Sequence, residues 1–260
     1  MTDPELVRER HGAVSVLRIN RPDQRNALNG EVIAGLAEGI VEAETSDAIR
    51  AVVLTGTGAR TFSAGLDLRE FAEAGAGGAG GGVRDALEVF QRLQDGRVAV
   101  PMVAAANGTA AAGGMEMLLG CDLVVASWDG RFGLPEVRRG LFSGGSGTTL
   151  GTRIPLAVAL ELTLTGELVG AQRAYELGLV NRVVPPAEVL PTALELAERI
   201  AANGPLGVAA TKELVRLWTS DPAAARTRRD HWRQVVFTSE DAAEGARAFV
   251  EKRDPVWRGR

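Results

Sequence analysis

One nearly uncharged stretch, residues 98–121, constrains the fold of this chain more than any other segment. Its sequence is VAVPMVAAANGTAAAGGMEMLLGC, and its only acidic or basic side chain is that of Glu116. Most of such a stretch belongs in a core, where an ionised carboxylate is almost never found without a partner, because desolvating the charge is costly. We therefore interpret Glu116 as a functional group that follows Gly113 and Gly114, a pair whose bare backbone lets a ligand approach closely. The alternative is an acid that merely complements the positive end of a helix.

Composition excludes several classes of protein. The 260 residues are 45% hydrophobic, and the net charge of -4 leaves no overall basic field for nucleic acid. One cysteine and two histidines provide neither an internal disulfide nor a common zinc site, which favours a reducing cytoplasm and no metal. The uncharged stretch contains Pro101 and is mostly Ala and Gly, and the first ten residues include five charged ones and no apolar run, so we expect neither a membrane span nor a signal peptide.

Short apolar runs alternate with helical patterns along the first 190 residues. Strands are expected near residues 14–19, 50–55, 101–106 and 122–126, and helices near residues 30–44, 83–93, 156–164 and 171–177. This alternation predicts an α/β core of parallel strands with right-handed crossovers. Asn29 is the expected N-cap of the first helix.

Helical patterns follow one another in the last quarter of the chain. Three of them begin near a proline, namely Pro191, Pro205 and Pro222, at first-turn positions where a missing backbone N–H costs nothing. We therefore expect two parts, an α/β core in residues 1–190 and a helical module in residues 191–260.

Three loops carry the candidate site residues: SAGLDL at 63–68, AAGGMEM at 111–117 and FGLPEVRRGLFSGGSGTT at 132–149. In this order and spacing they resemble the enoyl-CoA hydratase/isomerase (crotonase) superfamily. The likeness extends to RPDQRNALN at 21–29, to residues 164–184 and to KRDPVWRG at 252–259. It implies a crotonase-like stacked ββα spiral core with an acyl-CoA site, and a C-terminal trimerisation module that forms a homotrimer or a hexamer, a dimer of trimers.

The resemblance also implies a coenzyme A thioester as substrate and assigns the roles in catalysis. Glu116 and Glu136 would be catalytic, one activating water and the other positioning it and exchanging a proton at the α-carbon. The backbone N–H groups of Leu66 and Gly113 would form the oxyanion hole, and the backbone of Gly144 would help to hold the water. Repulsion between the two acids is expected to raise the pKa of at least one of them.

For coenzyme A, the resemblance implies contacts made mostly by the backbone of five residues: Ala27, Leu28, Ala64, Asp67 and Leu68. Arg25 and Lys252, the latter from this or a neighbouring subunit, would meet the phosphates. Each of these two charges is otherwise an ordinary exposed side chain. Taken alone, Glu136 would be a surface acid paired with Arg138 or Arg139.

Some positions depart from the superfamily pattern. Ala112 replaces the first of three glycines, Ser143 replaces the proline before Gly144, and Leu66 is larger than the alanine often found there. None of these changes removes a donor or an acid, but they bear on substrate fit and water placement. The glycine tract at 74–82, an expected mobile loop, lies where the superfamily shapes its acyl pocket.

The function we expect is that of an enoyl-CoA hydratase, a lyase that converts a 2-enoyl-CoA to a 3-hydroxyacyl-CoA in fatty-acid or related metabolism. It needs no cofactor, because coenzyme A is part of the substrate. The alternatives are an enoyl-CoA isomerase, a carnitinyl-CoA-type dehydratase, and a non-catalytic acyl-CoA-binding member, which would gain nothing from burying two carboxylates. A GxGxxG motif after the first strand is missing, and neither His11 nor His231 lies in a site-like loop, which argues against oxidoreductases and Ser-His-Asp hydrolases.

Overall fold

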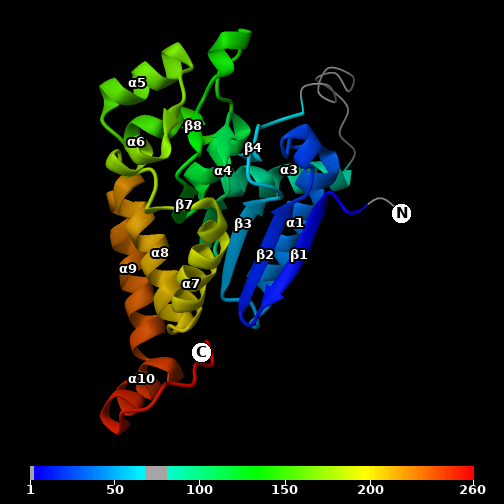
Figure 1. Ribbon diagram of the computed structural model, residues 1–260. Helices are drawn as coiled ribbons and strands as arrows, with labels where there is room; N and C mark the ends of the chain where they lie inside the picture. Colours follow the sequence, from blue (N-terminus) through cyan, green and yellow to red (C-terminus); the bar gives the residue numbers. More distant parts are fainter. Residues whose placement is uncertain (1–2, 68–80) are drawn as a thin grey trace.

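The computed structural model describes residues 3–67 and 81–260, which form two sheets and a set of helices (Figure 1). The larger sheet has the order β1 (Leu6–His11), β2 (Val14–Ile19), β3 (Ala51–Gly56), β5 (Met102–Ala106), β7 (Leu123–Ser127) and β10 (Arg182–Val184). The smaller sheet has the order β4 (Thr61–Ser63), β6 (Thr109–Ala111), β8 (Arg131–Gly133) and β9 (Val169–Gly170).

The chain passes repeatedly from one sheet to the other. β3, β5 and β7 are parallel neighbours in the larger sheet, and the strands that follow them, β4, β6 and β8, are parallel neighbours in the smaller one. Helix α3 (Gly81–Gln94) then leads from β4 to β5, and α4 (Gly113–Gly120) leads from β6 to β7. Each turn is thus strand, strand, helix, which confirms the predicted stacked ββα spiral.

The four strands that sequence analysis predicted, β2, β3, β5 and β7, each lie within one residue of their expected positions, and β3 and β5 are continuous apolar runs. β1 was not predicted, because its sequence LVRERH has only two apolar residues and then three charged ones, which is neither an apolar run nor an alternation. It is an edge strand that pairs antiparallel with β2. The strands of the smaller sheet have two or three residues each, which is too short for a periodic pattern.

The first helix, α1 (Gly30–Thr45), forms where expected. The side chain of Asn29 caps it by accepting a 3.0 Å hydrogen bond from the backbone N–H of Val32. Leu36 and Ile40 on its inner face are fully buried, so the helix closes one side of the larger sheet.

Helix α7 (Val189–Ala201) packs against the other face of the larger sheet. It buries Ala193 and Ala197 against valines of β2, β3, β5 and β7. Pro191 is its third residue and therefore still in the first turn, and the expected boundary between residues 190 and 191 falls inside this helix. Because α7 packs against the larger sheet, it belongs to the α/β core and not to the helical module.

The remaining helices are α5 (Leu156–Thr165), α6 (Ala171–Glu176), α8 (Pro205–Ser220), α9 (Pro222–Phe237) and α10 (Glu240–Glu251). In Figure 1, α8 and α9 run beside α7, and α10 lies at the lower end of the molecule. Ser239 caps α10 through a hydrogen bond from Ala242 N. In the part of the chain that the structure describes, no helix is both long and apolar enough to cross a membrane.

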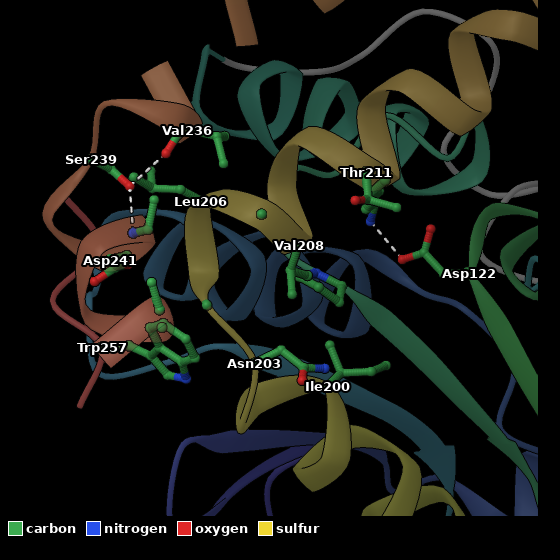
Figure 2. A pocket seen from close by; sticks show the side chains of 17 residues that line it. Asp122, Ile200, Asn203, Leu206, Val208, Thr211, Val236, Ser239, Asp241 and Trp257 are labelled. Atoms are coloured by element: carbon green, nitrogen blue, oxygen red, sulfur yellow. Dashed lines mark hydrogen bonds and ion pairs between the residues drawn. The ribbon is translucent and has the colours of Figure 1, made fainter. Parts of the chain in front are cut away.

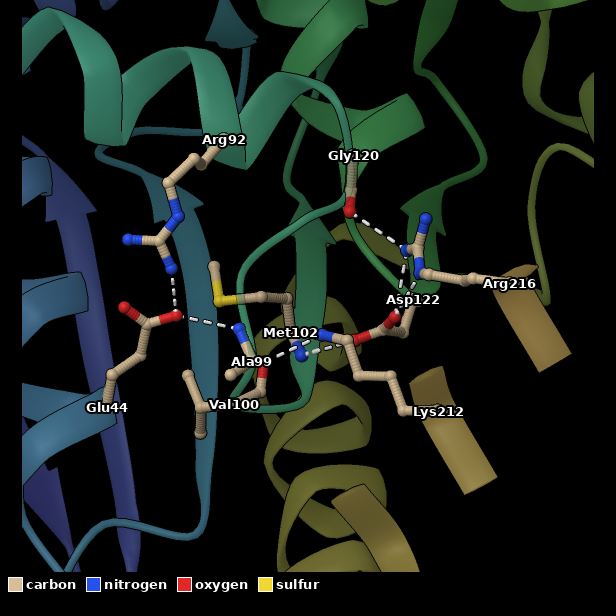
Figure 3. Close-up of polar contacts among 9 residues, drawn as sticks. All are labelled: Glu44, Arg92, Ala99, Val100, Met102, Gly120, Asp122, Lys212 and Arg216. Carbon is tan, nitrogen blue, oxygen red and sulfur yellow. Dashed lines mark hydrogen bonds and ion pairs between the residues drawn. The ribbon is translucent and has the colours of Figure 1, made fainter. Parts of the chain in front are cut away.

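Asp122 attaches α8 to the spiral core (Figure 3). One carboxylate oxygen accepts hydrogen bonds from Lys212 Nζ at 2.6 Å and Met102 N at 2.8 Å, and the other accepts from Arg216 Nη2 at 2.8 Å. Lys212 and Arg216 also donate to the carbonyls of Val100 and Gly120. Burial lowers the pKa of Lys212, and the charge of Asp122 opposes this shift. The C-terminal helices are therefore joined to the core by a charged contact beside the uncharged stretch.

Candidate active site

Glu116 lies in the first turn of α4, and only 5% of its surface is exposed. Its carboxylate accepts three hydrogen bonds. Oε1 accepts from Gly145 N at 2.8 Å and Gly147 N at 3.1 Å, and Oε2 accepts from Gln94 Nε2 at 3.0 Å. These donors replace the water that the buried charge has lost. The acid thus lies at a helix N-terminus, as the alternative interpretation expected, and is also held by specific partners, while its catalytic role stays a prediction.

Sequence reasoning missed the residues that hold this carboxylate. Gln94 ends α3 and is buried beside Leu93, one helical turn after Phe90. A polar residue in this otherwise apolar stripe was the available signal. A Cβ atom on Gly145 would lie 3.0 Å from each carboxylate oxygen of Glu116 and 2.9 Å from Gln94 Oε1, so a larger residue there would press on both side chains.

Glu136 begins a 3₁₀ helix, η3 (Glu136–Arg139), and is half-buried. Burial is the largest cause that raises its pKa, a hydrogen bond with Ser143 lowers the pKa, and the charge of Glu116 adds a smaller upward effect. The prediction that one of the two acids has a raised pKa is confirmed, but the main cause is desolvation, and repulsion between the acids is secondary. Ser143 links the two acids, because it hydrogen-bonds Glu136 and lies against Gly147, whose N–H donates to Glu116.

The second carboxylate oxygen of Glu136, Oε2, is buried and has no hydrogen-bond partner among residues 3–67 and 81–260. Of the two arginines expected to pair with it, Arg138 donates to the carbonyl of Thr165, while the charge of Arg139 slightly lowers the pKa of Glu136. Buried polar oxygens are usually hydrogen-bonded, so an unpaired one marks a place for a ligand or water.

Leu66 and Gly113 present neighbouring backbone N–H groups. Leu28 N donates to Gly65 O and Asp67 N donates to Leu28 O, both at 2.9 Å, so the N–H of Leu66 points away from Leu28. Gly113 is the first residue of α4, where N–H groups have no partner within the helix. A Cβ placed on Gly113 would lie 3.7 Å from Leu66 N. Two adjacent donors at a helix N-terminus can stabilise negative charge on an oxygen.

Close backbone contacts hold these two N–H groups together. A Cβ on Gly65, whose φ is +88°, would lie 2.8 Å from Gly113 N, so only glycine fits there. Ala112 adopts φ 52° and ψ -130°, a conformation that normally requires glycine, so its replacement of glycine stores strain beside the site. A Cβ on Gly114 would lie 2.2 Å from Ser63 O. Close packing against β4 therefore explains why this residue is glycine, rather than the approach of a ligand that we expected.

The expected coenzyme A residues lie around the chain entering and leaving β4. Ala64 N donates to Arg25 O at 3.1 Å, and Asp67 pairs with Arg21 at 3.1 Å, while the same guanidinium donates to Ala27 O. Leu28 lies beside them through its bridge to Leu66. Arg25 also lines a cavity of about 340 Å³.

The remaining site predictions concern Leu68 with the glycine tract, Lys252, and Gly144. Leu68 lies outside the described residues, as do residues 74–80 of the glycine tract. Lys252 follows α10, at the opposite end of the molecule from β4, so it does not meet Arg25 within one chain. Gly144 is exposed, and it is the N–H of the next residue, Gly145, that contacts Glu116. A water-holding role for Gly144 stays a prediction.

A larger cavity, of about 670 Å³, lies between α7, α8 and α10 (Figure 2). Its lining is mostly apolar and includes Leu206, Val208 and Trp257, with the Asp122 and Lys212 ion pair at one side. None of the candidate site residues lines it. Cavity size therefore does not locate the active site in this chain.

Comparison with known proteins agrees with this geometry. The family model described as "Enoyl-CoA hydratase/isomerase" matches residues 9–260. The chain is 38% identical to the enoyl-CoA hydratase EchA19 of Mycobacterium tuberculosis, with 99% of this chain and 97% of the relative covered. It is 35% identical to a carnitinyl-CoA dehydratase of Escherichia coli, with 96% and 97% covered. A crystal structure of an enoyl-CoA hydratase from Mycobacterium tuberculosis H37Rv is similar with a TM-score of 0.88 at 41% identity, covering 99% of this chain and 100% of that one. This chain belongs to the enoyl-CoA hydratase/isomerase (crotonase) superfamily.

Proposed function

We propose that this protein is a hydro-lyase that adds water across the double bond of a 2-enoyl-CoA thioester and forms a 3-hydroxyacyl-CoA. One observation carries the proposal. Glu116 and Glu136 are linked through one loop, because Ser143 hydrogen-bonds Glu136 and lies against Gly147, whose N–H donates to Glu116, and Glu116 lies in the helix whose first N–H, that of Gly113, adjoins the N–H of Leu66. Superfamily membership supports a coenzyme A thioester as the substrate.

The two N–H groups suit the charge that develops in this reaction. Addition of water to the β-carbon moves negative charge onto the thioester oxygen in an enolate-like transition state. Leu66 and Gly113 would donate to that oxygen, and the positive end of α4 would add to their effect. Loss of one such donor typically raises the barrier by about 3 kcal/mol.

The two acids would act on the water and on the α-carbon. Glu136 has an unpaired, buried Oε2 in the described region and a pKa raised by burial, which suits a group that takes up and releases a proton. Glu116, whose carboxylate is held by three donors, would position the water and exchange the proton at the α-carbon. Arg25 would meet a coenzyme A phosphate, and the backbone around Ala64 would bind the rest of that group.

A carnitinyl-CoA-type dehydratase is the second candidate. The chain is almost as similar to a carnitinyl-CoA dehydratase as to a hydratase, at 35% against 38% identity, with nearly as much of this chain covered. Elimination of water is the reverse of hydration and uses the same acid and base, so the two acids fit both reactions. An isomerase would need only one of them.

A panel of acyl-CoA thioesters that varies chain length, branching and double-bond position tests the proposal. We expect 2-enoyl-CoA substrates to lose their conjugated thioester absorbance, with products identified by mass and chirality. Turnover of carnitinyl-CoA alone would select the dehydratase, and turnover of 3-enoyl-CoA alone the isomerase. Tight binding with no turnover of any thioester would contradict an enzymatic role.

We further propose that the protein assembles as a homotrimer or as a pair of trimers. Large apolar side chains of α9 and α10 are strongly exposed in the single chain, including Phe237, Phe249 and Val250. Such exposure commonly marks an interface between proteins. In an assembly, Lys252 could reach the site of a neighbouring subunit. Light scattering coupled to size exclusion is expected to give three or six subunits, and a monomer would contradict the proposal.

A further inference from the structure

We propose that Gln94 is a positioning residue that directs the reactive lone pair of Glu116. By binding one side of Oε2, Gln94 leaves a single acceptor position on the carboxylate for the water or for the substrate's α-proton. The inference rests on the proposed hydro-lyase function and names a residue that acts through a catalytic acid.

A count of acceptor positions carries the argument. An ionised carboxylate has about four of them, two on each oxygen. The N–H groups of Gly145 and Gly147 occupy Oε1, and the amide of Gln94 occupies one position on Oε2. Within the described part of the chain, one position therefore remains, and it lies on Oε2. Without Gln94, two positions would be open there, and water could bind in the unproductive one.

Gln94 is itself held firmly enough to direct another side chain. It is 6% exposed and ends α3, which packs against α1 and α4. The end of α3 lies directly against the end of α4, because a Cβ on Gly120 would lie 1.8 Å from Leu93 O. Helix packing thus fixes the backbone on both sides of the contact between Gln94 and Glu116.

A purely structural role would have different consequences. If Gln94 only compensated a buried charge, its loss would lower stability, and activity would fall only as far as folded protein is lost. A positioning role instead lowers kcat with little change in KM, because the bound thioester is unaffected while the geometry of proton transfer is not.

The experiment compares Gln94→Met with a matched control on the same helix. Gln94→Met keeps the length of the side chain and removes the donor, and we expect kcat to fall about 10- to 100-fold with KM little changed. In the control Gln91→Met, an exposed glutamine loses a 3.0 Å hydrogen bond to Asp95, and kcat should stay at the wild-type value. A kcat for Gln94→Met equal to that of the wild type would overturn the inference.

A pH profile of Gln94→Glu provides a second readout. At low pH the new carboxyl group is protonated and can donate to Oε2 of Glu116, so the variant should retain much of the wild-type kcat. As the pH rises, the group ionises, loses its donor and repels Glu116, so the ratio of variant to wild-type kcat should fall. A ratio that is constant with pH would also overturn the inference.

Failure of this inference and failure of the proposed function give different results. An active wild type with an equally active Gln94→Met overturns only the role of Gln94. A wild type that turns over no thioester in the panel overturns the proposed function, and crystal structures then decide whether Gln94 orients the carboxylate. We expect the Glu116 carboxylate to be rotated in Gln94→Met relative to the wild type, and an unchanged orientation would overturn that claim as well.

Discussion

The two acids of the site lie in regions with contrasting structure. Glu116 belongs to α4, is almost completely buried, and has three hydrogen-bond donors on its carboxylate. Glu136 begins a short 3₁₀ helix, is half-buried, and has one oxygen with no partner in the described region. The same side chain thus has two different surroundings, a carboxylate held by three donors in one region and a half-buried carboxyl group with a raised pKa in the other.

Replacement of each acid by its amide should have the largest effect. We expect Glu136→Gln to lower kcat for a 2-enoyl-CoA by about 10²- to 10⁴-fold, because the amide cannot transfer the proton to or from water. Glu116→Gln should lower hydration by a similar factor. Steady-state kinetics with binding of a saturated acyl-CoA as control measures both effects. Undiminished activity of Glu136→Gln would show that the base is misassigned. If Glu116→Gln still turned over a 3-enoyl-CoA at the wild-type rate, the protein would be an isomerase.

Replacement of each acid by leucine should separate the two regions in stability. Glu116→Leu leaves three donors without their acceptor and should lower the free energy of unfolding by about 2–4 kcal/mol. Glu136→Leu removes a carboxylate that burial disfavours and should leave the free energy of unfolding nearly unchanged. Urea unfolding of both variants at neutral pH makes the comparison. Equal losses in the two variants would contradict the proposed difference.

Neighbouring glycines test how closely Glu116 is enclosed. Gly145→Ala would place a Cβ 3.0 Å from both carboxylate oxygens of Glu116, and we expect it to cost about 1–3 kcal/mol of stability and to lower kcat. Gly144→Ala is the matched control for stability, because a Cβ there meets nothing within 4 Å. The thermal unfolding of the two variants should differ clearly. Similar behaviour of both variants would mean that the loop moves away from Glu116.

Ser143→Ala should have the smallest effect, a shift in pH dependence. The hydrogen bond with Ser143 lowers the pKa of Glu136, so its loss should raise that pKa further. If the ionised form of Glu136 is the base, the acidic limb of the kcat/KM profile should move to higher pH. A limb that stays in place or moves to lower pH would contradict the contact or the role.

The raised pKa of Glu136 also determines how the free energy of unfolding changes with pH. Because burial raises the folded-state pKa of Glu136 above its ordinary value of 4.5, its favourable contribution is fully present below that pH. The contribution is lost as the pH rises through the folded-state value. Ser143→Ala should extend this loss to higher pH, which urea unfolding at several pH values would measure.

The sequence by itself determined the parts that depend on local pattern. Continuous apolar runs marked β3, β5 and β7, Asn29 marked the start of α1, and a lone acid among apolar residues marked Glu116. These features are encoded within a few neighbouring residues, where periodicity, capping and burial act. The order and spacing of the three site loops along the chain then indicated the superfamily.

Only the tertiary structure decided which groups surround each acid. Gln94 and Gly145 lie 22 and 29 residues from Glu116 in the chain, and no local pattern connects them with it. The unpaired oxygen of Glu136 and the position of Lys252 far from β4 also follow only from packing. The reason is physical: a hydrogen bond between distant segments depends on distances that exist only after the helices and strands between those segments have packed together.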